Sequence, residues 1–134
     1  MPDNDTTAFL DGSPFAVVGA STSRDKYGNK ALRVYMQNDR SVYPVNPRAE
    51  EIEGLRSYPD LMSLPEKPHG VSIVTPPKIT EQIVDDAIQL GIEHLWMQPG
   101  AESPDASARA RRAGINVIDD GSCVLVALGF EDKS

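Results

Sequence analysis

The sequence is short of cysteine, of long apolar runs and of positive charge. Its single cysteine, Cys123, cannot form an intramolecular disulfide, which fits the reducing environment of the cytoplasm. No run approaches the roughly 20 apolar residues of a membrane-spanning helix, and the acidic N-terminus lacks the pattern of a secretory signal. The net charge of −7 disfavours nucleic acids and anionic membranes as partners. A small anionic ligand held by a few local cations is still compatible with these absences.

A chain of 134 residues, of which 40% are hydrophobic, is long enough for one domain with a buried core. We find no internal repeat and no low-complexity segment. We predict that the polar residues 1–13 are flexible, that residues 14–130 form the domain, and that residues 131–134 form a C-terminal tail.

Five short apolar runs rich in Val, Ile and aromatic residues are predicted to be strands buried on both faces of a parallel sheet. They lie at 15–19, 41–46, 70–74, 94–98 and 115–119. Apolar residues recur with helical spacing within 28–39, 77–90 and 103–113. Between them, 47–69 is predicted to be a loop with one helical turn at 59–63, and 121–130 a final helix or strand. This alternation predicts an α/β fold: a Rossmann-like, doubly wound sheet of five parallel strands in the order 3-2-1-4-5, with three layers α/β/α.

Ligands of open parallel sheets bind at the carboxyl ends of the strands, so the residues after each strand are the candidates for a site. Gly19 follows the first strand and permits a tight turn. Backbone amides at the start of the next helix, with the hydroxyls of Ser21 and Ser23, are suited to phosphate oxygens. Arg24 and Lys26 add positive charge. The glycine fingerprint of dinucleotide-binding folds is incomplete, because the next glycine is Gly28.

The end of the second strand discriminates between nucleotides. Sites for NAD usually place Asp or Glu here, to accept a hydrogen bond from the ribose 2′-hydroxyl. This sequence has Asn46, Pro47 and Arg48 instead. A cation in place of an acid favours a ribose that carries a phosphate, as in NADP or coenzyme A.

The residues after the third and fourth strands provide an apolar surface and one side-chain amide. Pro76 and Pro77 follow the third strand and form a rigid surface suited to an adenine or a pantetheine arm. Gln98 follows the fourth strand and can form a hydrogen bond with a ligand amide, while Gly100 permits close approach. Cys123, after the fifth strand, is interpreted as a small buried side chain or as a thiol beside a ligand's thiol.

The sequence shows no catalytic group at this edge of the sheet. His69 and His94 precede their strands and therefore lie at the opposite edge. No cluster of Cys and His has the spacing of metal ligands, no Ser–His–acid set falls on one side, and the phosphate loop of nucleotide hydrolases is missing. We therefore predict a binding protein with no catalytic residue and no metal site.

Four segments occur in a familiar order and spacing: AVVGASTSRDKYGNKAL, VYPVNPRAEEIEGLRSYPDL, IVTPPK and LWMQPGAES. Over roughly residues 13 to 130, the sequence resembles the stand-alone CoA-binding domain proteins. These are single-domain relatives of the nucleotide-binding part of succinyl-CoA synthetase α subunits. The resemblance implies a Rossmann-type fold that binds coenzyme A. It implies no ligase activity, because the phosphorylated histidine of the synthetase belongs to a separate domain.

The resemblance also implies a set of binding residues. It places Gly19, Ala20, Ser21 and Ser23 at the diphosphate, and Asn46, Pro47 and Arg48 at the ribose and its 3′-phosphate. Val74, Thr75, Pro76 and Pro77 would flank the adenine and the pantetheine, and Gln98, Pro99 and Gly100 would close the other side. The leading hypothesis is a non-catalytic module that binds CoA or acyl-CoA as a sensor or carrier. An NADP-dependent oxidoreductase and a nucleotide-free protein-interaction domain are the alternatives, and a protein partner or a homodimer is left open.

Overall fold

The computed structural model describes residues 2–132. The helices are α1 (Pro2–Leu10), α2 (Tyr27–Gln37), α3 (Pro77–Leu90), α4 (Pro104–Arg112) and α5 (Val124–Ala127), with a 3-10 turn η1 (Leu61–Ser63). The strands are β1 (Phe15–Val18), β2 (Val42–Val45), β3 (Glu51–Ile52), β4 (Leu55–Arg56), β5 (Gly70–Ile73), β6 (His94–Met97) and β7 (Asn116–Ile118). Residues 133 and 134 of the predicted tail lie outside the described residues. No helix within 2–132 is both long enough and apolar enough to cross a membrane.

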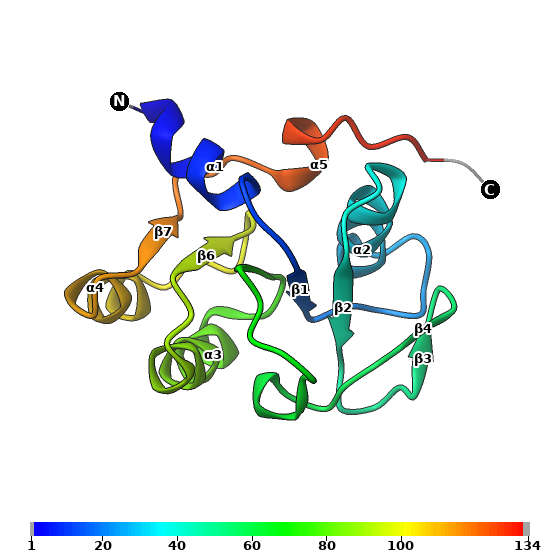
Figure 1. The fold of residues 1–134 in the computed structure, drawn as a ribbon, viewed down its shortest axis with the longest axis horizontal. Coiled ribbons are helices and arrows are strands. Elements are labelled where there is room, and N and C mark those ends of the chain that lie inside the picture. The colour runs from blue at the N-terminus through cyan, green and yellow to red at the C-terminus, as the bar shows by residue number, and fades with distance from the viewer. Residues whose placement is uncertain (1, 133–134) are drawn as a thin grey trace.

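Five of the strands, β1, β2, β5, β6 and β7, form one parallel sheet. Helices α3 and α4 cover one face of it, and α1, α2 and α5 cover the other (Figure 1). Because successive side chains of a strand point to opposite faces, Ala16 and Val18 of β1 enter one core cluster, while Phe15 and Val17 enter the other. The predicted α/β fold with a five-stranded parallel sheet in three layers is confirmed.

The order of the strands differs from the prediction. It is β2-β1-β5-β6-β7, so the third predicted strand lies beside the first and not beside the second, and the order 3-2-1-4-5 is wrong. Pro44 gives the physical reason, because a proline inside a strand lacks an N–H and is tolerated at a sheet edge. Its carbonyl faces outward and accepts a hydrogen bond from the N–H of Tyr58 at 3.0 Å. The order therefore reverses between β1 and β5, and this is the switch point.

Helices α3 and α4 have the local signals that the sequence predicts. Pro77 occupies the first turn of α3, and Gly91 ends that helix with a φ of +74°. The hydroxyl of Ser103 accepts a hydrogen bond from the N–H of Ala106 and begins α4. The apolar tail, for which helix and strand were both open, forms the short helix α5.

The flexibility of residues 1–13 stays a prediction, and the described part of this segment contains helix α1, which the sequence pattern did not indicate. The ring of Phe9 is fully buried, with centroids 5.5 Å from Phe15 and 5.3 Å from Trp96. Gly70 leaves the space for it, since a Cβ there would lie 2.8 Å from the Phe9 ring. A lone aromatic residue in a polar stretch has no periodicity, so the sequence pattern did not reveal this contact.

The long connection after β2 contains a β-hairpin that was not predicted. Strands β3 and β4 pair in antiparallel fashion, and Ile52 anchors them in the core beside α2. Glu53 and Gly54 form the turn, with φ values of +52° and +80°, which is the backbone of a tight two-residue hairpin. The 3-10 turn η1 lies within the segment predicted to form one helical turn.

Candidate functional site

Three segments meet at the carboxyl end of β1, and two glycines allow them to do so. Gly19 has a φ of +93°, and a Cβ there would lie 2.0 Å from the carbonyl oxygen of Val74 at the end of β5. Gly28, in the first turn of α2, is equally confined, because its Cβ would lie 2.0 Å from the carbonyl oxygen of Gly19. Gly28 therefore provides the close helix–strand packing that a later glycine provides in the dinucleotide fingerprint.

The loop between β1 and α2 is held by hydrogen bonds to its backbone. The carbonyl of Ala20 accepts from Asn46 Nδ2 at 2.8 Å, and the Ser21 hydroxyl accepts from the N–H of Ser23 at 3.1 Å. Ser23 and Lys26 are exposed. No side chain caps α2 at Lys26, so the positive end of the helix dipole and its first N–H groups are available to an anion.

Arg24, which the sequence analysis treats as a source of positive charge in this loop, is paired with Glu53 of the β3–β4 turn. Arg24 Nη1 lies 2.6 Å from Glu53 Oε1, and Glu53 Oε2 accepts from Asn29 Nδ2 at 3.1 Å. The buried guanidinium of Arg33 donates to Asn29 Oδ1 at 2.6 Å and to the carbonyl of Arg24 at 2.7 Å. Glu53 was missed because the hairpin that carries it was not predicted. The network fixes the loop and balances part of its charge.

Asn46 joins the end of β2 to the loop after β1. Its side-chain oxygen accepts from the N–H of Arg48 at 2.7 Å, which forms an Asx turn, while its amide nitrogen donates to Ala20. Pro47 and Arg48 project from this turn and are exposed. Within residues 2–132, the Arg48 guanidinium makes no hydrogen bond or ion pair.

A cavity of about 480 Å³, which we call the edge pocket, lies at the switch point between β2, β1 and β5. Its walls are mainly apolar. Seven of its lining residues were predicted: Gly19, Asn46, Pro47, Arg48, Val74, Thr75 and Pro76. The others are Val18, Val45, Pro59, Asp60, Ile79 and Ile83. The sequence assigned Ile79 and Ile83 to the apolar stripe of a core helix, and only the strand order places the start of that helix over the switch point.

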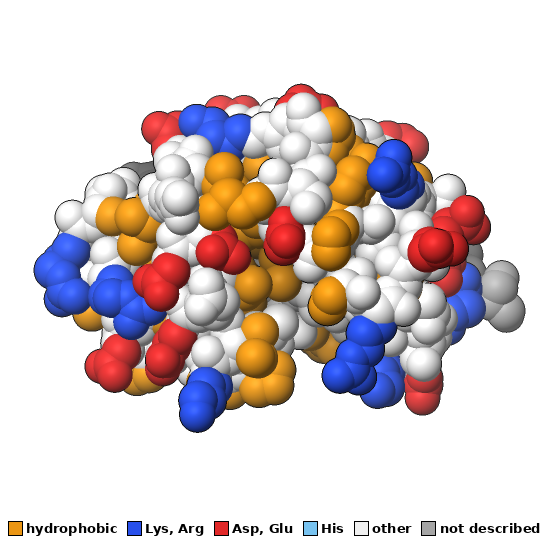
Figure 2. All heavy atoms as spheres, turned by 90° about the horizontal axis from the view of Figure 1, so that it is seen from below, with side chains coloured by type: hydrophobic (Ala, Val, Ile, Leu, Met, Phe, Trp, Pro, Cys, Tyr) orange, Lys and Arg blue, Asp and Glu red, His pale blue; other side chains and the backbone are white. Residues whose placement is uncertain are grey.

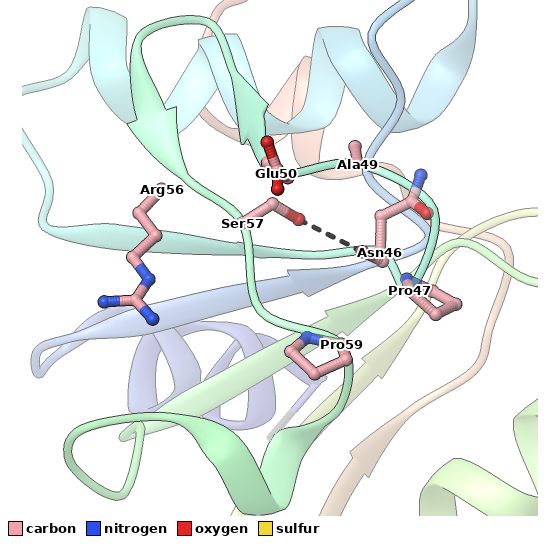
Figure 3. A pocket seen from close by; sticks show the side chains of 7 residues that line it. All are labelled: Asn46, Pro47, Ala49, Glu50, Arg56, Ser57 and Pro59. Carbon is pink, nitrogen blue, oxygen red and sulfur yellow. Dashed lines mark hydrogen bonds between the residues drawn. The ribbon is translucent and has the colours of Figure 1, made fainter.

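Two further cavities adjoin the edge pocket. The side pocket, about 350 Å³, shares Val74, Thr75 and Pro76 with it and adds Pro99, Gly100 and Ala101. The hairpin pocket, about 400 Å³, shares Asn46, Pro47 and Pro59 and adds Ala49, Glu50, Arg56 and Ser57 (Figure 3). Seen from the side of η1, α3 and the hairpin, hydrophobic side chains gather near the middle of the surface, with charged side chains around them (Figure 2). The edge pocket thus shares lining residues with a neighbouring cavity on each side.

The remaining predicted residues lie outside these pockets. Ala20, Ser21, Ser23, Arg24 and Lys26 belong to the loop before α2, and Pro77 starts α3 without lining the edge pocket or the side pocket. Gln98 is fully buried. Its oxygen accepts from the Tyr27 hydroxyl at 2.8 Å and from the N–H of Val124 at 2.9 Å, whereas its Nε2 has no hydrogen-bond partner among the described residues.

Tyr27 links Gln98 to Cys123. Because Val124 N–H can only donate, the Gln98 atom facing it is the oxygen, and the single proton of Tyr27 is donated to the same oxygen. The Cys123 thiol, which also contacts the Tyr27 hydroxyl, is then the donor to it. Burial, followed by the hydrogen bond to Cys123, raises the pKa of Tyr27 well above its usual value, so the phenol stays protonated. The half-buried thiol is thus tied into the packing of α2 and α5.

Comparisons with solved structures agree with this fold. The chain superimposes on a conserved hypothetical protein from Pyrococcus furiosus with a TM-score of 0.81 and 37% identity, covering 87% of this chain and 99% of the other. A hypothetical protein from Pyrococcus horikoshii gives a TM-score of 0.88 at 28% identity, covering 94% and 88%.

The curated relatives are much longer proteins than this chain. The chain is 33% identical over 78 residues to acetate–CoA ligase (ADP-forming) I from Archaeoglobus fulgidus, covering 58% of this chain and 11% of the ligase. It is 32% identical over 88 residues to the α subunit of acetate–CoA ligase (ADP-forming) II from Pyrococcus furiosus, covering 63% and 19%. The chain thus spans less than a fifth of these relatives. Residues 13–128 match the family described as CoA binding domain. The chain belongs to the CoA-binding domain family.

Proposed function

We propose that the protein binds coenzyme A, free or acylated, along the carboxyl edge of its sheet and has no catalytic activity of its own. The observation that carries this proposal is the edge pocket, which combines apolar walls with the guanidinium of Arg48, for which residues 2–132 provide no hydrogen-bond or ion-pair partner. Pro47, Pro59 and Pro76 offer flat surfaces to an adenine ring. Arg48, at the rim, is suited to the phosphate on the ribose, because a guanidinium matches phosphate geometry.

The diphosphate of the ligand would lie at the start of α2. The uncapped helix start and the tight turn at Gly19 let an anion approach the backbone N–H groups. Lys26 is exposed beside this position. Arg24, which is paired with Glu53, contributes less net charge than the sequence suggested.

The pantetheine arm would follow the side pocket past Pro76, Pro99 and Gly100. Among the described residues that line the edge and side pockets there is no Cys, His or Lys, and the carboxylate in the edge pocket, Asp60, is exposed and bonded to Ser63. We therefore propose a carrier or sensor role for this domain. We place it in the cytoplasm, where Cys123 would stay reduced.

Isothermal titration calorimetry with CoA, dephospho-CoA and NADPH tests the proposal. We expect CoA to bind tighter than dephospho-CoA by about tenfold, since a charge-assisted contact contributes roughly 1.5–3 kcal/mol. Arg48→Ala should abolish that difference, whereas Arg112→Ala, an exposed arginine in the last turn of α4, should leave it intact. No CoA binding below millimolar concentration, or NADPH binding as tight as CoA, would contradict the proposal.

A further inference from the structure

The edge pocket has two charged lining residues, Arg48 and Asp60. Asp60 follows Pro59 and precedes η1, with an extended backbone at φ −158° and ψ 174°. One of its carboxylate oxygens, Oδ1, accepts from the N–H of Ser63 at 2.9 Å and from the Ser63 hydroxyl at 2.8 Å. The other oxygen makes no hydrogen bond with any described residue. One oxygen of this exposed carboxylate therefore holds the turn, and the residue that carries the other oxygen lines a mainly apolar pocket.

The local fold alone does not require a carboxylate at this position. Capping the first turn of a helix takes one side-chain oxygen, which Ser, Thr or Asn supplies as well as Asp. The pocket beside Asp60 has the opposite character, because Pro47, Pro59 and Pro76 make its walls apolar. A flat ring that fills such a pocket presents its edge to whatever polar group lies at the rim. An ionised Asp60 at that rim accepts hydrogen bonds and cannot donate them.

Purine bases differ in the group at position 6, which is the group that such an acceptor would contact. Adenine carries an amino group at position 6, which donates hydrogen bonds, whereas guanine and hypoxanthine carry a carbonyl oxygen there, which accepts them. A carboxylate attracts the amino group and repels the carbonyl. Arg48 has the reverse preference, but it lies on the turn after β2, where the proposed function assigns it to the ribose phosphate.

We propose that Asp60 is a specificity-determining residue that selects adenine over 6-oxopurines in the edge pocket. The unused oxygen of its carboxylate accepts a hydrogen bond from the exocyclic amino group, while the oxygen bonded to Ser63 keeps η1 in place. This inference rests on the proposed function, since it requires the nucleotide end of the ligand to occupy the edge pocket. It adds the chemical feature by which the base is recognised.

The test uses the nucleotide end of the ligand by itself. Adenosine 3′,5′-bisphosphate and guanosine 3′,5′-bisphosphate are titrated into the wild-type protein and into Asp60→Asn. Asparagine keeps an oxygen for Ser63 and replaces the other acceptor by an NH₂ donor. We expect wild type to prefer the adenine nucleotide by about tenfold or more, the range of discrimination for a good base contact. Asp60→Asn should narrow the ratio to within about threefold, by weaker adenine and stronger guanine binding.

Two further variants keep the result interpretable. Asp105→Asn removes an exposed acid from the first turn of α4, and we expect it to retain the wild-type preference. Asp60→Ser keeps an oxygen that caps η1 but lacks the second carboxylate oxygen. It replaces Asp60→Asn in the titrations if Asp60→Asn unfolds at a lower temperature than wild type. Binding of neither nucleotide to wild type would overturn the proposed function and this inference together. Tight binding of both with equal affinity, or an unchanged ratio in Asp60→Asn, would overturn the inference and leave the proposed function standing.

Discussion

The two sides of Gly19 differ in how much space they leave. Toward α2, the backbone is in contact at Gly28, and Asn29, Arg33 and Glu53 form a tight hydrogen-bonded network around the loop. Toward α3, the strand ends separate and leave the edge pocket, whose polar rim groups Arg48 and Asp60 keep unused hydrogen-bonding capacity. We call these the closed side and the open side. The closed side is a frame that fixes the loop, and we propose that the open side is where the ligand is recognised.

The largest effect is expected on the closed side, at Gly19. Gly19→Ala should lower the free energy of unfolding by about 4 kcal/mol or more, because the new Cβ would lie 2.0 Å from the backbone oxygen of Val74. Urea denaturation followed by circular dichroism measures this. Gly100 is the matched control, with a similar φ of +96° but no atom within 4 Å of its Cβ position. Gly100→Ala should cost only the conformational strain, about 1–2 kcal/mol, and equal losses in the two variants would contradict the account.

The buried network of the closed side gives the next largest effect. Asn29→Ala removes the acceptor of Arg33, which is 5% exposed, and the donor to Ser21 and Glu53. We expect a loss of about 3 kcal/mol in unfolding free energy, because a charged group is left buried with fewer partners. Asn38→Ala, which breaks one part-buried and one exposed hydrogen bond to backbone carbonyls at the end of α2, should cost about 1 kcal/mol or less. A loss at Asn29 no larger than at Asn38 would show that the network does not stabilise the loop.

On the open side, a substitution should change binding rather than stability. Ile79 is 49% exposed and lines the edge pocket. Ile79→Ser should weaken CoA binding about tenfold, since roughly 1.4 kcal/mol of apolar contact is lost, while unfolding free energy changes by about 0.5 kcal/mol or less. Val126, which is 82% exposed on α5, is the control, and Val126→Ser should bind CoA as wild type does. Equal weakening by both substitutions would refute the location of the ligand.

The smallest expected effect on stability concerns an ion pair that belongs to neither the closed side nor the open side. The Arg111 guanidinium, 2.8 Å from Asp119, holds the pKa of that carboxyl below its usual range. A lowered folded-state pKa contributes stability above the unfolded pKa near 4, and this stability is lost as pH falls through the folded value. Asp119→Asn should therefore cost about 0.2–1 kcal/mol at neutral pH. The difference in unfolding free energy between wild type and Asp119→Asn should vanish in acid. Urea denaturation across a pH series measures it, and a difference that persists in acid would contradict the prediction.

The sequence predicts those parts of the fold that depend on local pattern. Apolar runs predict the strands, Pro77 and Ser103 predict helix starts, and Gly19, Asn46 and Thr75 lie at strand ends as expected. The strand order was mispredicted, although Pro44 marks β2 as an edge strand. Glu53, Asp60 and Ile79 could not be placed, because their roles depend on a hairpin, a turn and a helix that approach the switch point only in three dimensions. For the same reason the sequence could not tell that Gln98 is buried behind Tyr27.

The most direct test of the central claim is a titration of the ¹⁵N-labelled protein with CoA, followed by backbone amide chemical shifts. The account predicts the largest shifts on the open side and at the start of α2: Gly19, Gly28, Asn46, Arg48, Thr75 and Gly100. It predicts little change at the opposite edge of the sheet, around Ile92 and Ile115, which line a separate cavity there. Shifts concentrated at that opposite edge, or none at millimolar CoA, would contradict it.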